Sequence, residues 1–361
     1  MSKFEIPEIP HELVLKARLK QAAVWDLADL DLADPVVTIS WDGSAVNGVL
    51  PADPRRMVED REYDLAVQLQ NVRRKIEMLE AGSTGPNSIP TLNLLHFGTG
   101  PVATAFGATM VMREGSQPHF HPAVHTAEEV LRMEMPDLRR GGWLGEIIDR
   151  IEFFNEATQG KIPITTSDNA GPWCIASSIW HYEDMIEGLL TCPEAVHHLL
   201  GLCTRAIIEV DERQIETARN AWGVIGDAPG LSCFPRGAGL ADDVMVTVST
   251  AMWREFFKPY NEIISRRYGG IIYHCCMEHE RHLQGMSETA GFMGYDADPG
   301  YNSMDVIEKT LTGKGVWNRV VSDAATARRC RGKFGFFLGA HGHTKENAVE
   351  NARRLLDAVH A

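Results

Sequence analysis

Apolar positions recur along this chain with two different periods. Over residues 52–82 they return at steps of three and four, which predicts one long amphipathic helix that ends at Gly82. The first 90 residues as a whole predict helices and irregular connections. From about residue 90 onward, short β-branched apolar runs alternate with longer helical patterns. We therefore expect a helical N-terminal extension, residues 1–90, packed on a larger unit, residues 91–361, within a single domain.

The strand-like runs of the larger unit are each followed by a helical pattern. They span residues 162–168, 230–234, 270–275, 292–298, 315–321 and 334–343, with the last strand expected to end near residue 340. Strands that alternate with helices indicate βαβ units and a parallel sheet. The number of units, and the lack of a GxGxxG motif after a first strand, favour a closed (β/α)₈ TIM barrel over a doubly wound sheet. In such barrels the chemistry lies where strands end and helices begin.

Charge and cysteine usage narrow the classes of partner. The formal net charge is −14, which argues against nucleic acid, because phosphate binding needs a basic face. No apolar run of about eighteen residues predicts a membrane span, and no signal-peptide pattern opens the sequence. Seven cysteines form no CxxC pair. Free thiols in a reducing cytoplasm are the expectation.

The run GGIIYHCCMEHE carries the first candidate chemistry. On a strand, residues i and i+2 point the same way, so His274 and Cys276 share a face while Cys275 points to the other. Imidazole and thiolate together suit zinc. The alternative is the end of a buried strand, with a histidine bonded to a carbonyl group and a buried free cysteine.

A second signal follows the last predicted strand. His341 and His343 precede Thr344, which is a plausible N-cap of the final helix. His341 would lie at the rim and supply the third ligand that a catalytic zinc needs. An ordinary pair of loop histidines is the alternative, and Glu278 or His279 then becomes the candidate third ligand.

The segment HFHPAVH is a competing cluster, with His119, His121 and His125. Its HxH pattern is similar to a cupin metal motif. A cupin has a glutamate four or five residues further on and many short antiparallel strands, whereas the segment after this motif is helical in pattern. A loop that closes over the barrel mouth and meets a substrate or partner is the favoured interpretation.

Several stretches together resemble the uroporphyrinogen decarboxylase superfamily. They are DNAGPWCIASSIWHYEDMIEGLLTCPEAVHHLL, GLADDVMVTVSTAMWREFFKPY, YHCCM and VENARRLLDAV. YHCCM resembles the H-x-C-G zinc motif of the cobalamin-dependent methyltransferase branch. The resemblance covers residues 165 to 361 well and the preceding part loosely. It implies a (β/α)₈ barrel.

The resemblance also separates two chemistries. The arginine-rich element with which true decarboxylases hold a tetrapyrrole is not found here. The methyltransferase branch uses zinc held by His-x-Cys and by a further cysteine before the last helix; His274 and Cys276 match the first two, and His341 stands where the cysteine is usual. Two histidines and one thiolate make a better Lewis acid than two thiolates and activate a thiol less well.

The resulting functional hypothesis is a zinc-dependent methyltransferase. It moves a methyl group between a small methylated substrate, with an O-methyl donor favoured, and a cobalamin (corrinoid) supplied by a separate partner protein, since no D-x-H-x-x-G motif is present. Asp168 and Asp296 are rim carboxylates that could act as acid or orienting group, or cap helices, and Glu278 could be a base or a ligand. Alternatives are methyl transfer from methylcobalamin to a thiol, tetrapyrrole decarboxylation, and a scaffold that only holds a corrinoid protein. The sequence decides neither the direction of transfer nor the oligomeric state, for which a homodimer is one candidate.

Overall fold

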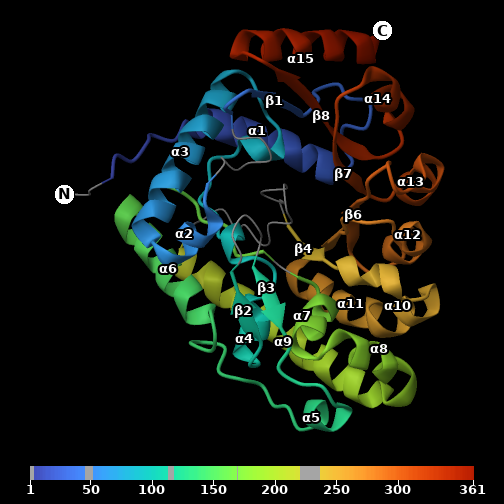
Figure 1. Ribbon diagram of the computed structural model, residues 1–361. Helices are drawn as coiled ribbons and strands as arrows, with labels where there is room; N and C mark the ends of the chain where they lie inside the picture. The colour runs from blue at the N-terminus through green and yellow to red at the C-terminus, as the bar shows by residue number, and fades with distance from the viewer. Residues whose placement is uncertain (1–3, 45–51, 113–117, 169, 220–235) are drawn as a thin grey trace.

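The computed structural model describes residues 4–44, 52–112, 118–168, 170–219 and 236–361. Figure 1 shows the arrangement of its helices and strands. The helices are α1 (His11–Trp25), α2 (Pro54–Glu59), α3 (Arg61–Glu80), α4 (Pro101–Ala105), α5 (Ala127–Leu131), α6 (Leu144–Thr158), α7 (Pro172–Ile179), α8 (Tyr182–Thr191), α9 (Pro193–Ala218), α10 (Thr250–Phe256), α11 (Lys258–Tyr268), α12 (Glu280–Ser287), α13 (Met304–Leu311), α14 (Ala324–Cys330) and α15 (Lys345–His360). The strands are β1 (Val37–Trp41), β2 (Thr109–Val111), β3 (His119–His121), β4 (Ala238–Ala241), β5 (Ile271–His274), β6 (Phe292–Asp296), β7 (Val316–Val321) and β8 (Gly335–Gly342), and three short 3₁₀ helices are η2 (Pro86–Ser88), η3 (Leu95–Phe97) and η4 (Asp243–Thr247).

The main sheet is parallel and has the strand order β1-β8-β7-β6-β5-β4. Parallel bridges continue it past β4, first between Ala170 and Ala241 and then between Leu92 and Ile164. Helices α10 to α15 lie along the outside of strands β4 to β8 (Figure 1). The α/β class that the sequence predicts is confirmed, and the bridged segments extend the sheet in the direction expected for a barrel.

Strand β1 is a strand where the sequence predicts only helices and irregular connections. Its residues pair in parallel with β8 over the full length of β1, from Val37 with Leu338 to Trp41 with Gly342. The first 90 residues therefore contribute a strand to the sheet. The apolar residues of β1 are mostly buried, which explains why the sheet accepts it.

Three further differences separate the expected from the observed elements. The helix expected over residues 52–82 is interrupted at Asp60, where the backbone is extended. The Asp60 side chain caps α3 by accepting from the amides of Glu62 and Tyr63. Residues 162–168 form a bridge at Ile164 and no regular strand. Strand β8 continues past residue 340 to Gly342, so His341 lies within it. A fourth expected element, the strand at 230–234, lies outside the described residues.

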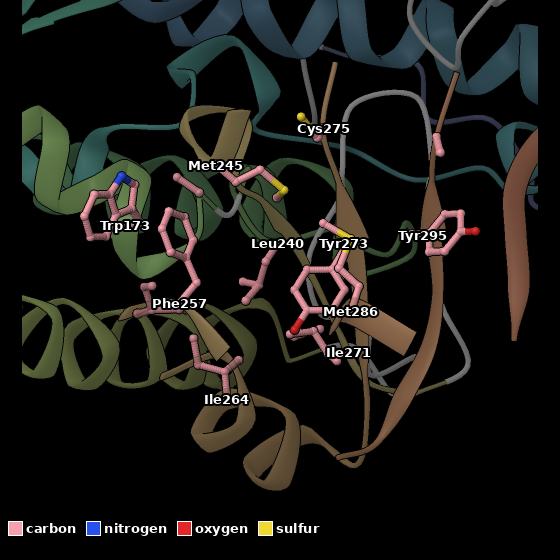
Figure 2. Packing of buried hydrophobic residues seen from close by; sticks show 14 of the residues in the cluster. Trp173, Leu240, Met245, Phe257, Ile264, Ile271, Tyr273, Cys275, Met286 and Tyr295 are labelled. Carbon is pink, nitrogen blue, oxygen red and sulfur yellow. The ribbon is translucent and has the colours of Figure 1, made fainter. Parts of the chain in front are cut away.

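Residues of α7, α10 and α11 pack against strands β4 to β6 in the hydrophobic core. Trp173 of α7 stacks on Phe257 with ring centroids 4.5 Å apart, and Leu240 and Tyr273 are fully buried on neighbouring strands (Figure 2). Cys275 is also fully buried and belongs to this cluster. Because β5 is buried along its whole length, the residues that follow it are held in a defined position.

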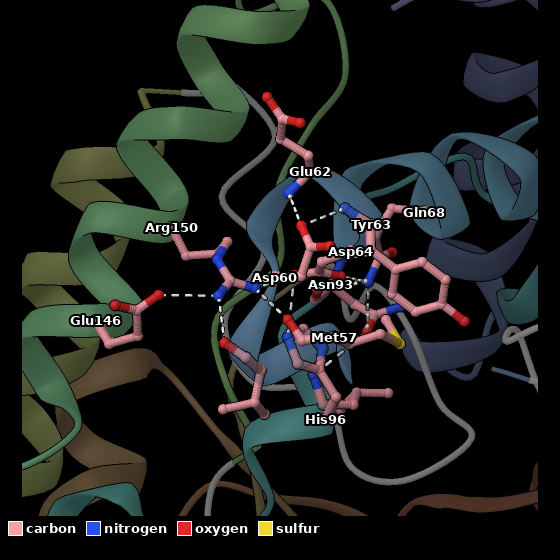
Figure 3. A network of polar contacts seen from close by, with 12 residues as sticks. Met57, Asp60, Glu62, Tyr63, Asp64, Gln68, Asn93, His96, Glu146 and Arg150 are labelled. Atoms are coloured by element: carbon pink, nitrogen blue, oxygen red, sulfur yellow. Dashed lines mark hydrogen bonds and ion pairs between the residues drawn. The ribbon is translucent and has the colours of Figure 1, made fainter. Parts of the chain in front are cut away.

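A buried polar network joins α6 to the N-terminal helices (Figure 3). Arg150 forms an ion pair with Asp64 and donates to the carbonyl groups of Met57 (2.7 Å) and Val58 (2.8 Å). The Nε2 atom of His96 lies 3.1 Å from Asp64 Oδ2. Arg150 and Asp64 are both almost fully buried, so this network fixes the N-terminal helices against the rest of the fold.

Among the described residues, no helix combines the length and apolar character required to span a membrane.

Candidate metal centre

The candidate site begins where β5 ends. His274 is the last residue of β5, and its Nε2 atom lies 3.1 Å from Sγ of Cys276. His274 is buried and Cys276 is exposed, so the pair lies at the surface end of the strand. Cys275 points into the core, as Figure 2 shows. The alternation predicted from the sequence, with His274 and Cys276 on one side and Cys275 on the other, is confirmed.

Asp243 completes a group of three potential ligands. It begins η4, directly after β4, and its Oδ1 accepts a hydrogen bond from the Cys276 amide at 2.6 Å. One ligand atom from each of Asp243, His274 and Cys276 lies within 4.8 Å of the other two. Strands β4 and β5 pair so that Ala241 is opposite His274, which brings the loop after β4 to the end of β5.

Asp296, the last residue of β6, contacts the ring nitrogen of His274 that is not directed at Cys276. Its Oδ2 atom lies 2.8 Å from Nδ1 of His274, and its other oxygen forms an ion pair with Arg319 of β7. Burial favours the neutral imidazole, but the hydrogen bonds to Asp296 and Cys276 outweigh it and raise the pKa of His274 to about 10. This contact favours the orienting role for Asp296 and leaves Nε2 directed at Cys276.

The structure does not bring His341 into this group. Its Nδ1 atom lies 3.1 Å from Ser40 Oγ, and its Nε2 atom lies 3.1 Å from Asp42 Oδ1. His343 also contacts Asp42, at 3.0 Å. Hydrogen bonds from His343 and His341 lower the pKa of Asp42. His341 lies outside the ligand group because β1 pairs with β8, and this pairing places Ser40 opposite His341.

The other predicted residues lie in different surroundings. Glu278 is exposed and accepts from the Glu280 amide at 3.0 Å, so it faces the start of α12. Asp168 is buried at the end of the bridged segment that precedes Ala170. His279 is buried, with Nδ1 bonded to the Met277 carbonyl at 2.7 Å. Among the described residues, none of these three belongs to the ligand group around His274.

Two residues of the site were missed by reasoning from the sequence. Asp243 contributes to the family resemblance through the block GLADDVMV and is not among the residues expected to bind metal, although an acidic pair directly after a barrel strand is a usable signal. Arg319 gave no signal, because a single arginine within an apolar strand does not indicate which residue it will contact. Its ion pairs with Asp296 and with Asp298 (3.3 Å) appear only when β6 and β7 are adjacent.

The matching family model and the curated relatives carry the same family name. Residues 95–361 match the family described as uroporphyrinogen decarboxylase (URO-D). A uroporphyrinogen decarboxylase of Xanthomonas euvesicatoria pv. vesicatoria is 28% identical over 177 residues, which are 46% of this chain and 43% of that protein. The corresponding protein of Xanthomonas axonopodis pv. citri is 27% identical over the same length and shares. The aligned region therefore spans less than half of these curated relatives.

A solved structure is similar over nearly the whole chain. It is a methyltransferase from Methanosarcina mazei, with a TM-score of 0.61 and 17% sequence identity. The superposition covers 95% of this chain and 98% of that one. At this identity the likeness concerns the fold, and it agrees with the parallel α/β architecture described above.

Proposed function

This chain belongs to the uroporphyrinogen decarboxylase family, and within it we propose that the protein is a zinc-dependent methyltransferase. It would transfer a methyl group between a small methylated substrate and a corrinoid carried by a partner protein. The observation that carries the proposal is the group of Asp243, His274 and Cys276 at the carboxyl ends of β4 and β5.

The three ligand side chains fit zinc, and so do the residues that hold His274 in position. Carboxylate, imidazole and thiolate are the three kinds of side chain that bind zinc in proteins, and three protein ligands are typical of a catalytic site. A histidine that binds a metal through one ring nitrogen usually donates a hydrogen bond from the other to a carboxylate or carbonyl oxygen. The contact of His274 Nδ1 with Asp296 fits this arrangement. Arg319 balances the charge of that carboxylate and holds it in place.

The residues of the chain have separate tasks in this proposal. Asp243, His274 and Cys276 would hold the zinc ion, which when bound supplies Lewis acidity at the leaving or attacking atom of the substrate. Asp296 keeps a proton on Nδ1 of His274 and so fixes the orientation of the ring. The mixed set contains a single thiolate and is harder than a set with two, which favours a methylated oxygen substrate over a thiol.

The partner proposal follows from the sequence and the charge. The printed sequence contains no D-x-H-x-x-G corrinoid motif, so the corrinoid is assigned to a separate protein. The names of the curated relatives favour tetrapyrrole decarboxylation as a second candidate. The net charge of −14 is unfavourable for a substrate with many carboxylates, and this is why methyl transfer is preferred.

The test is a reconstituted methyl transfer. The zinc-loaded protein is mixed with a reduced corrinoid protein and an O-methyl donor, and the cobalt absorption spectrum is followed. We expect conversion from the cob(I) to the methylated form, a loss of about tenfold or more in rate for Cys276→Ala, and an unchanged rate for Cys192→Ala at the start of α9. Efficient decarboxylation of uroporphyrinogen, with no corrinoid methylation, would reverse the proposal in favour of the second candidate.

A further inference from the structure

A second group of potential metal ligands lies where the loop after β3 meets the start of α8. His125, His181 and Asp184 each offer one ligand atom, and these atoms lie within 4.8 Å of one another. Asp184 Oδ2 is 3.1 Å from His181 Nδ1 and 3.5 Å from His125 Nδ1. The two imidazole rings stack with centroids 5.1 Å apart. The group shares no residue with the centre at His274.

The backbone holds the two histidines in register. Val124 and Trp180, the residues next to them, form a parallel bridge, and the His181 amide donates to the Val124 carbonyl at 2.9 Å. The indole nitrogen of Trp180 donates to the carbonyl of His125 at 3.2 Å. Asp184 lies in the first turn of α8, one turn after His181. Two segments of the chain, the loop after β3 and the start of α8, therefore present the group in a fixed arrangement.

One nitrogen of the group contacts the carboxylate without a hydrogen bond of regular geometry. The Nδ1 atom of His181 is shielded from solvent and makes no hydrogen bond, although it faces the Asp184 carboxylate at 3.1 Å. A buried polar atom without a hydrogen bond is uncommon in a native fold and calls for an explanation. A cation bound between the carboxylate and the two rings would satisfy this nitrogen directly.

We propose that His125, His181 and Asp184 form a second binding site for a divalent transition metal, with zinc as the expected ion. Two imidazoles and one carboxylate are an established zinc ligand set that leaves a fourth position for solvent or another ligand. The ion would tie the segment after β3 to the junction of α7 and α8. This site is independent of the proposed methyl transfer, because it uses none of the residues assigned to it. The competing explanation is an exposed ion pair with no metal, which would contribute little to stability.

The first experiment measures zinc in a protein whose main centre is disabled. Purified Cys276→Ala protein is titrated with zinc alone by calorimetry, and we expect one ion to bind per chain. In that background Asp184→Asn should weaken the remaining binding about tenfold or more. Glu183→Gln, the matched control, removes the same charge from the neighbouring exposed residue of the same helical turn and should leave binding unchanged. Circular dichroism verifies that each variant is folded.

A second experiment distinguishes the two sites by the absorption spectrum of cobalt(II) bound in place of zinc. Cobalt(II) at the His274 centre should show a thiolate-to-metal charge-transfer band, whereas cobalt at the second site should show only weak d–d bands, because it has no sulfur ligand. His181→Ala should remove the d–d bands that survive in the Cys276→Ala protein. If that protein binds no zinc, if Asp184→Asn and Glu183→Gln behave alike, or if His121→Ala abolishes binding instead, the proposed ligand set is wrong.

Discussion

At the scale of single residues, two adjacent cysteines differ in what surrounds them. Cys276 is exposed beside His274, whereas Cys275 is fully buried in the core, and that burial raises the pKa of its thiol. We expect Cys276→Ala to lose the zinc ion bound at the His274 centre, and Cys275→Ala to retain that ion at some cost in stability. Metal content by mass spectrometry checks this. Equal zinc loss from both variants would contradict the assignment of their side chains to opposite faces.

The third ligand can be decided by a pair of substitutions. Asp243→Asn keeps an oxygen that can accept from the Cys276 amide but removes the charge that zinc needs, so zinc affinity should fall about tenfold or more. His341→Ala should leave zinc affinity unchanged, because that imidazole contacts Ser40 and Asp42. Competition with a chromophoric chelator gives both affinities. Zinc release by His341→Ala alone would restore the ligand set that the sequence first suggested.

At the scale of elements, close contact between strands limits what the sheet accepts. A Cβ atom added at Gly294 of β6 would lie 2.2 Å from the carbonyl oxygen of Val316, its partner on β7. Gly294→Ala should therefore destabilise the protein by about 2 kcal/mol or more. Gly201, in α9, has open space around its Cβ position, and Gly201→Ala should stabilise by about 1 kcal/mol. Urea unfolding measures both, and equal effects would refute the packing argument.

Helix α12 carries a histidine that makes stability depend on pH. Burial lowers the pKa of His282 to about 4, even though the ring bonds to the Met245 carbonyl at 3.0 Å. The unfolded chain takes up this proton near pH 6.5, so unfolding binds a proton between pH 6.5 and 4, and the free energy of unfolding falls as the pH decreases. His282→Gln should remove about 2 kcal/mol of that decrease.

Unfolding curves of metal-free protein at a series of pH values provide the measurement. The difference between the native and His282→Gln proteins should stay constant above pH 7 and shrink below it. Parallel stability profiles across the whole range would show that His282 is not the responsible group.

At the scale of the whole molecule, a buried ion pair joins the N-terminal helices to the rest of the fold (Figure 3). Arg150→Met leaves the Asp64 carboxylate buried without its cation, and we expect a loss of about 3–5 kcal/mol. Arg140→Met breaks the exposed pair with Asp149 and should cost less than about 1 kcal/mol. Guanidinium unfolding distinguishes the two. A small effect at Arg150 would mean that the network does not secure the N-terminal helices.

Local patterns were enough to predict much of this protein. Short continuous apolar runs identified β5 to β8, which are buried along most of their length, and the helical patterns identified the helices after them. The shared direction of His274 and Cys276 followed from strand geometry alone, since residues i and i+2 need no information from elsewhere in the chain.

Only the tertiary structure decided which further groups meet these residues. Asp243 reaches Cys276 because β4 and β5 are paired with Ala241 opposite His274, and Asp296 reaches His274 because β6 is the next strand. His341 is directed to Asp42 by β1, a strand within a segment that was expected to be helical. These contacts depend on strand order and register, which arise from the packing of the whole chain and not from any local repeat.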